Sequence, residues 1–74
     1  MKHHSYLLCV SNEGYPASLE ERKLYEHIPD ASAENRRLVR VVDESGEDYL
    51  YPAKLFVPVS LPQSVVEALE RHRA

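Results

Sequence analysis

The groups in this chain that could act as a nucleophile, an acid or a base are one cysteine, four histidines and twelve carboxylates. Cys9 lies in the apolar run 6–10, where a thiol is usually inert because burial raises its pKa. His27 and His72 could each serve as a general base, but neither has a second group at a spacing that indicates a catalytic partner. We therefore expect the protein not to be an enzyme.

A cluster of acidic residues surrounds one turn and could attract a cation: Asp43, Glu44, Glu47 and Asp48. Their spacing differs from that of the calcium loop, whose ligands alternate and end in a distant glutamate. The sequence also lacks zinc-ligand spacing and a phosphate-binding glycine loop, and the paired histidines near the start have no further ligands close by. We expect a solvated turn, no metal site and no cofactor.

The basic residues are scattered, and the formal net charge is −3. The only local cluster is formed by Arg36, Arg37 and Arg40, and it is flanked by Glu34 and Asp43. Binding to a phosphate backbone relies on a clustered positive surface. A solvated entry to a strand therefore explains this cluster better than a nucleic-acid site does.

The chain has 74 residues, which is enough for one small domain, 1–74, with a marginal core. A single cysteine cannot form an intrachain disulfide, and it fits a reducing cytoplasm. The apolar run 6–10 is too short for the core of a signal peptide or for a membrane span. We expect a cytoplasmic protein with no membrane partner.

Most of the remaining pattern predicts short strands. Residues 38–42 are rich in β-branched side chains, and Arg40 should face solvent while Val41 faces the core. A turn containing Gly46 leads to a return strand over 48–51, which Pro52 ends. Three further segments complete this part of the chain: a strand over 6–10, a single turn over 53–55 and a short edge strand over 56–59.

The segment 18–28 carries two conflicting signals. Ser18 and Glu21 form a capping box, and the spacing of Leu24 and Ile28 suits a helix. The alternation over 23–28 also permits a strand, although Glu26 interrupts its apolar face. Residues 31–37 are polar and indicate a loop or a single helical turn.

The end of the chain has a helical period. Leu61, Val65 and Leu69 recur every fourth residue, and Ser60 and Pro62 are typical of a helix start. The sequence therefore predicts a helix over 60–73. Its apolar stripe must be covered by the rest of the domain or by a second chain.

Several residues give the chain a resemblance to a group of short bacterial and phage proteins with a small SH3-like β-barrel, most of them functionally uncharacterised. The matching positions span roughly residues 6–59: Cys9-Val10, Leu19, Lys23 with Tyr25, Asp43 with Gly46, Tyr51-Pro52 and Phe56. Arg22 departs from the pattern, since these proteins usually have glycine just before the lysine.

The resemblance implies a mainly β protein, in which residues 5–59 form an SH3-like five-stranded barrel and a C-terminal α-helix follows. A barrel needs about five strands, so we expect 24–28 to be a strand despite its helical signal. SH3-like barrels often bind extended peptides in an aromatic groove, for which the candidates are Tyr15, Tyr51, Pro52 and Leu55. The absence of tryptophan weakens this assignment.

Three functions remain open at this point. The first is a non-catalytic module that binds another protein of unknown identity. The second is a structural homo-oligomer in which the C-terminal helix covers a neighbouring copy. The third is a small nucleic-acid-associated regulator, such as a toxin–antitoxin or phage-defence component, that would use the arginine cluster defined above.

Overall fold

The computed structural model of the chain describes residues 5–71. His3, His4 and His72 lie outside the described residues, as does the end of the helix expected over 60–73. The elements are β1 (Ser5–Cys9), β2 (Leu24–Ile28), α1 (Ala31–Asn35), β3 (Leu38–Val42), β4 (Asp48–Pro52), the 3₁₀ turn η1 (Ala53–Leu55), β5 (Phe56–Val59) and α2 (Gln63–Arg71).

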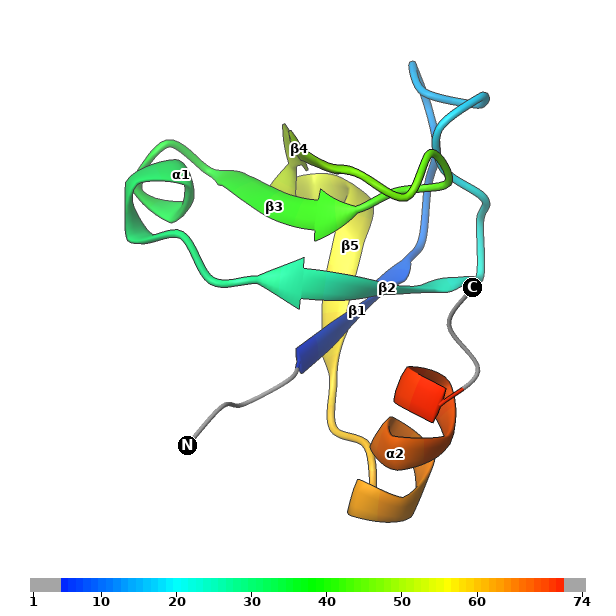
Figure 1. The fold of residues 1–74 in the computed structure, drawn as a ribbon. Helices are drawn as coiled ribbons and strands as arrows, with labels where there is room; N and C mark the ends of the chain where they lie inside the picture. Colours follow the sequence, from blue (N-terminus) through cyan, green and yellow to red (C-terminus); the bar gives the residue numbers. More distant parts are fainter. Residues whose placement is uncertain (1–4, 72–74) are drawn as a thin grey trace.

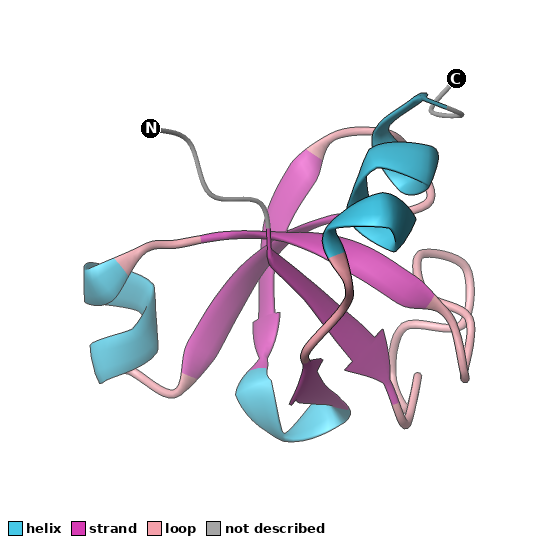
Figure 2. Ribbon diagram, turned by 90° about the horizontal axis from the view of Figure 1, so that it is seen from below, coloured by secondary structure: helices cyan, strands magenta, loops and turns pink. Residues whose placement is uncertain are grey.

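All five strands join one antiparallel sheet in the order β4-β3-β2-β1-β5 (Figure 1). The expected mainly β architecture with a C-terminal helix is thus confirmed. β4 and β5 remain as the two edges, so the strand pairing does not close into the expected barrel. The strands instead run in widely different directions, as Figure 2 shows, and the twisted sheet bends around one core.

β2 is a strand, against the helical signal of its own sequence. Tyr25 pairs with Leu7 of β1, and both side chains are buried. β3 pairs with the other end of β2, at His27 and Ile28. Ser18 and Glu21, which would cap the alternative helix, lie in two separate turns. Pairing on both sides and burial of Tyr25 therefore override the local propensity.

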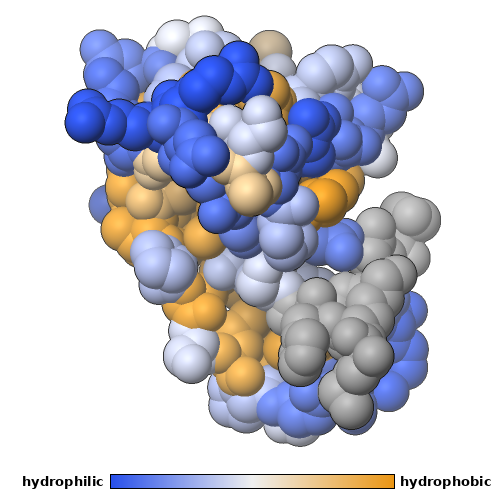
Figure 3. All heavy atoms as spheres, turned by 90° about the vertical axis from the view of Figure 1, so that its left-hand side faces the viewer, coloured by the Kyte–Doolittle hydropathy of each residue, from blue (hydrophilic) through white to orange (hydrophobic). Residues whose placement is uncertain are grey.

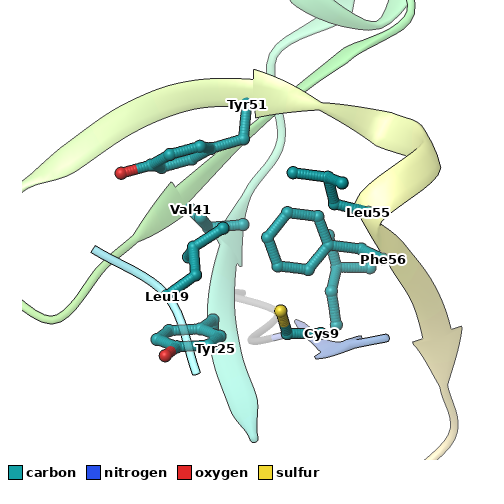
Figure 4. Close-up of a cluster of buried hydrophobic side chains, with 8 residues drawn as sticks. Cys9, Leu19, Tyr25, Val41, Tyr51, Leu55 and Phe56 are labelled. Carbon is teal, nitrogen blue, oxygen red and sulfur yellow. The ribbon is translucent and has the colours of Figure 1, made fainter. Parts of the chain in front are cut away.

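The core lies on the inner face of the sheet and is drawn in Figure 4. It consists of Leu7, Cys9, Leu19, Tyr25, Val41, Tyr51, Leu55 and Phe56. The rings of Tyr25 and Phe56 meet edge to face, with their centroids 6.3 Å apart. The hydroxyl groups of Tyr25 and Tyr51 point out of the same side of the cluster (Figure 4).

Short connections hold the strands in place. Of the two alternatives left open for 31–37, a loop or a single helical turn, the structure shows the helical turn α1, and Asp30 caps it by accepting a hydrogen bond from the Ala33 amide at 3.1 Å. The turn between β3 and β4 contains Gly46 at φ +84°, a left-handed conformation that glycine adopts without steric cost. The turn expected over 53–55 is confirmed as η1.

α2 starts at Gln63, three residues later than the sequence predicted. The Val65 and Val66 amides donate to the Pro62 carbonyl, which makes Pro62 the point where helical bonding begins. Ser60 and Leu61 belong to the connection from β5 instead. Neither helix within residues 5–71 has the length and apolar character needed to cross a membrane.

Candidate binding groove

A groove of about 730 Å³ lies between α2 and the sheet. The residues that line it come from β1, from β2 and the position before it, from the end of β3 and the following turn, and from α2: Tyr6, Lys23, Leu24, Tyr25, Glu26, Val42, Asp43, Glu44, Gly46, Ser64, Val65, Ala68 and Leu69. In Figure 3 hydrophobic surface appears in the middle and lower parts of the face that is drawn, while the upper end is mostly hydrophilic. The groove is thus lined by apolar and charged side chains together.

The sheet wall of the groove exists because two neighbouring strands separate there. β2 and β3 pair only at His27 with Val41 and at Ile28 with Arg40. Residues 24–26 therefore pair with β1 alone, and the end of β3 turns away from them. Leu24 and Val42 stand on the two sides of this opening and are both half-buried.

The helix wall is the apolar stripe of α2. Val65, Ala68 and Leu69 are spaced by three and four residues and so share one face of the helix. No residue of the described helix is buried, and Val65 is 38% exposed. One hydrogen bond ties the far end of α2 to the sheet, from the Tyr6 hydroxyl to Glu70 Oε2 at 2.8 Å.

Tyr6 also shows which side of the sheet the helix occupies. Side chains alternate along β1, so Tyr6 points to the side opposite Leu7 and Cys9, which enter the core. Because Tyr6 bonds to α2, the helix lies on the outer face of the sheet. Most of the groove therefore lies outside the core, and Tyr25 belongs to both, since it is a core residue that also lines the groove.

A polar network closes one end of the groove. The Tyr25 hydroxyl donates to Glu44 Oε2 at 2.5 Å and accepts from the Glu20 amide at 2.7 Å. The Lys23 ammonium lies 2.5 Å from the same Glu44 oxygen. Burial raises the pKa of Tyr25, and the bond to Glu44 raises it further. The bonds from Lys23 and then Tyr25 lower the pKa of Glu44, so this carboxylate is ionised at neutral pH.

Asp43 forms a second pair of this kind at the same end. Its carboxylate accepts hydrogen bonds from the Tyr51 hydroxyl, from the Ser45 hydroxyl at 2.5 Å and from the Ser45 amide at 2.8 Å. Burial alone would raise the pKa of Asp43, but these three bonds outweigh it and lower the pKa overall. Two members of the acidic cluster therefore have a structural role: Asp43 accepts a hydrogen bond from the hydroxyl of Tyr51, and Glu44 accepts one from the hydroxyl of Tyr25.

Of the four residues predicted to bind a peptide, two lie in the core. Tyr51 and Leu55 are only 4% and 3% exposed. Tyr15 is 38% exposed, and its ring meets that of Tyr51 edge to face at 4.9 Å. Pro52 is half-buried. Of the four, only Tyr15 and Pro52 offer surface to a ligand, and none of them lines the groove along α2.

The three arginines of the predicted basic cluster do not act together. Arg40 lies 3.0 Å from Asp30 and 3.0 Å from Asp48, so two carboxylates neutralise its charge. Arg36 and Arg37 are exposed at the end of α1. Bonds to Asp30 and Asp48 raise the pKa of Arg40 further. Arg40 therefore links the cap of α1 to the pairing of β3 with β4.

The residues considered for catalysis have structural contacts. Cys9 is fully buried, and burial raises the pKa of its thiol. On His27, Nδ1 lies 3.1 Å from the Ser5 hydroxyl across the β1–β2 pair, and Nε2 lies 3.4 Å from Glu34 Oε2 of α1. Among residues 5–71, no three His, Cys, Asp or Glu side chains are placed to hold a metal ion.

The sequence indicated one wall of the groove and missed the other. The stripe on α2 was visible as a helical period, but the opening between β2 and β3 depends on where a strand pairing ends. No local pattern marks that point.

Comparison of the chain with protein-family models, curated proteins and solved structures gave no match. The interpretation of the groove therefore depends on its own geometry and chemistry.

Proposed function

We propose that this protein is a non-catalytic protein-interaction module, built as a small SH3-like barrel, whose groove along α2 receives a short apolar segment of another protein. The barrel assignment is supported by five short antiparallel strands that share one inner core. The free, buried thiol of Cys9 is consistent with a reducing cytoplasm as its location.

The observation that carries the proposal is an amphipathic helix that holds its apolar face over the sheet without burying it. Val65, Ala68 and Leu69 face Leu24 and Val42 across the groove. A cavity of about 730 Å³ is within the range that accommodates a few side chains of a ligand. Filling it would remove apolar surface of both walls from water, which is the main driving force for association.

The non-catalytic part of the proposal is supported by the surroundings of the reactive groups. The thiol of Cys9 is fully buried, and the His27 ring lies between Ser5 and Glu34. Tyr25 and Glu44, two of the titratable residues that line the groove, bond to each other. A tyrosine with a raised pKa is a poor base and a poor nucleophile at neutral pH.

The test is selection of ligands from a phage-displayed library of random 12-residue peptides on the immobilised protein. We expect selected peptides to shift the amide NMR signals of residues 23–26 and 64–69. Val65→Asp should weaken their binding about tenfold or more, because it places a charge in the apolar wall. Val10→Asp is the matched control, since Val10 is 47% exposed and does not line the groove.

Selection of no peptide, or of peptides that bind wild type and Val65→Asp equally well, would overturn the proposal. Circular dichroism of both variants checks that the fold is kept. A homo-oligomer is the second candidate, and multi-angle light scattering separates the two. We expect a monomer, whereas a dimer that dissociates in Val65→Asp would assign the groove to a second copy.

A further inference from the structure

We infer that the free edge of β4 is a second interaction site, at which an extended segment of another protein adds a sixth strand to the sheet. This site goes beyond the proposed function, because β4 does not line the groove along α2. An edge strand presents N–H and C=O groups that no neighbouring strand uses, and an added strand bonds to such groups.

The hydrogen-bond pattern of β4 determines which of its backbone groups face outward. Residue pairs in an antiparallel ladder alternate between hydrogen-bonded and non-hydrogen-bonded pairs. The Asp43 amide donates to the Glu47 carbonyl at 3.0 Å, so this pair is hydrogen-bonded. Tyr49 therefore bonds to β3, whereas the N–H and C=O groups of Asp48 and Leu50 point away from it. Within residues 5–71, no hydrogen bond involves these outward groups.

The opposite edge of the sheet, β5, is protected. The Val10 amide donates to the Leu55 carbonyl at 2.8 Å, and the same alternation then points the backbone groups of Phe56 and Pro58 outward. Pro58 has no N–H, and the Phe56 N–H donates to the Ala53 carbonyl. Among the described strands, β4 is thus the edge that offers both donors and acceptors.

The side chains of β4 indicate what kind of segment fits. Tyr49 is 50% exposed on the face that it shares with Tyr51, and Leu50 lies half-buried on the other face beside Arg40. Adjacent strands are stabilised by aromatic and β-branched side chains that lie next to each other. An extended segment rich in such residues, and without proline at its pairing positions, therefore fits this edge best.

The same geometry disfavours a second copy of this chain. Two β4 strands paired about a two-fold axis would each supply Pro52, which has no N–H and occupies the next outward position after Leu50. A symmetrical register either places Pro52 opposite Asp48 or Leu50, or shortens the overlap to residues 48–50 or fewer. The first leaves a carbonyl without a donor, and the second loses hydrogen bonds. A segment of a different protein has neither limit.

Amide hydrogen exchange followed by NMR tests the edge directly. In the free protein, the Leu50 amide should exchange at least about tenfold faster than the amides of Tyr49 and Tyr51, which bond to β3. Peptides are then selected from a phage-displayed library of random 12-residue sequences on immobilised Val65→Asp, in which the groove is impaired. We expect peptides with alternating β-branched or aromatic residues that bind wild type equally well and slow exchange at Leu50.

Leu50→Pro removes the outward N–H and should weaken binding of these peptides about three- to tenfold. Leu50→Val keeps the N–H and is the matched control, which should bind within about twofold of wild type. Circular dichroism checks the fold of both variants. If Leu50→Pro does not fold, a synthetic chain with N-methylleucine at position 50 replaces it.

A Leu50 amide that is already protected in the free protein, or a selection that yields no peptide, would overturn this inference. Peptides that bind Leu50→Pro as tightly as wild type would do the same. A dimer that light scattering detects in wild type and that Leu50→Pro abolishes would assign the edge to a second copy, against the inference. Because the selection uses Val65→Asp, these outcomes do not depend on the groove, and the proposed function succeeds or fails separately.

Discussion

Arg22 holds a backbone conformation that suits glycine, and replacing it with glycine should stabilise the protein. It lies in the turn just before β2 with φ +67°, in the left-handed region. Its amide donates to the Cys9 carbonyl at 2.7 Å, and its side chain is exposed. The hydrogen bond uses the backbone alone, so Arg22→Gly keeps it while removing the Cβ atom that causes the strain.

The magnitude follows from two opposing terms. A left-handed conformation costs an ordinary L-residue about 1–2 kcal/mol. Glycine removes this cost, but it loses about 0.5–1 kcal/mol more conformational entropy on folding than a residue such as alanine. The net stabilisation should be about 0.5–1 kcal/mol, which raises the Tm of a domain of this size by roughly 2–8 °C.

Urea denaturation and calorimetry of wild type and three variants test this reasoning. Arg22→Ala removes the charge and keeps the Cβ atom, so its stability should stay close to that of wild type. Arg36→Gly removes an exposed arginine at φ −103°, where no left-handed strain exists, and should lower stability. The reasoning is refuted if Arg22→Gly is no more stable than wild type, or if Arg22→Ala is stabilised equally.

Three further predictions concern the carboxylate–tyrosine pairs and the core. The pKa values of Asp43 and Glu44 are lowered in the folded state, so their contribution to stability is complete above about pH 5. It should be lost as the pH falls through the lowered folded-state pKa values, and acid titration followed by circular dichroism would contradict this if stability stayed constant throughout the acid range. Tyr51→Phe should destabilise the protein by about 1–3 kcal/mol, because it removes a donor from nearly buried Asp43. Tyr49→Phe, at an exposed tyrosine, is its control and should have little effect in urea denaturation. Cys9 is fully buried, so alkylation by iodoacetamide should be slow in native buffer and fast in urea; equal rates would show that the core opens readily.

The elements with consistent local signals could be predicted from the sequence. The β-branched run 38–42, the turn at Gly46 and the stop at Pro52 all indicate a hairpin, and β3 and β4 form it. The helical period after residue 60 predicts α2, although its first residue was placed too early. These signals are local because turns, strand propensity and helical period each depend on neighbouring residues.

The residues of the candidate site were harder to predict from local sequence signals. Tyr51 and Leu55 were candidates for a peptide site because SH3-like barrels often form such a groove beside their Pro-marked turn. Their burial results from Tyr25, Phe56 and Cys9, which reach the same core from three distant parts of the chain. The tyrosine hydroxyl then requires an acceptor, and Asp43 of the acidic turn is that acceptor.

Composition and period alone establish a small chain with one cysteine, β-rich segments and an amphipathic helix at its end. Whether residues 24–28 form a strand or a helix was decided by β1 and β3, since hydrogen bonding on both sides outweighs a weak local preference. The groove also depends on contacts between distant segments, because β2 and β3 separate after two paired positions and α2 lies over the opening. Contacts between residues far apart in the chain determine both the strand at 24–28 and the groove. Local sequence patterns cannot predict such contacts.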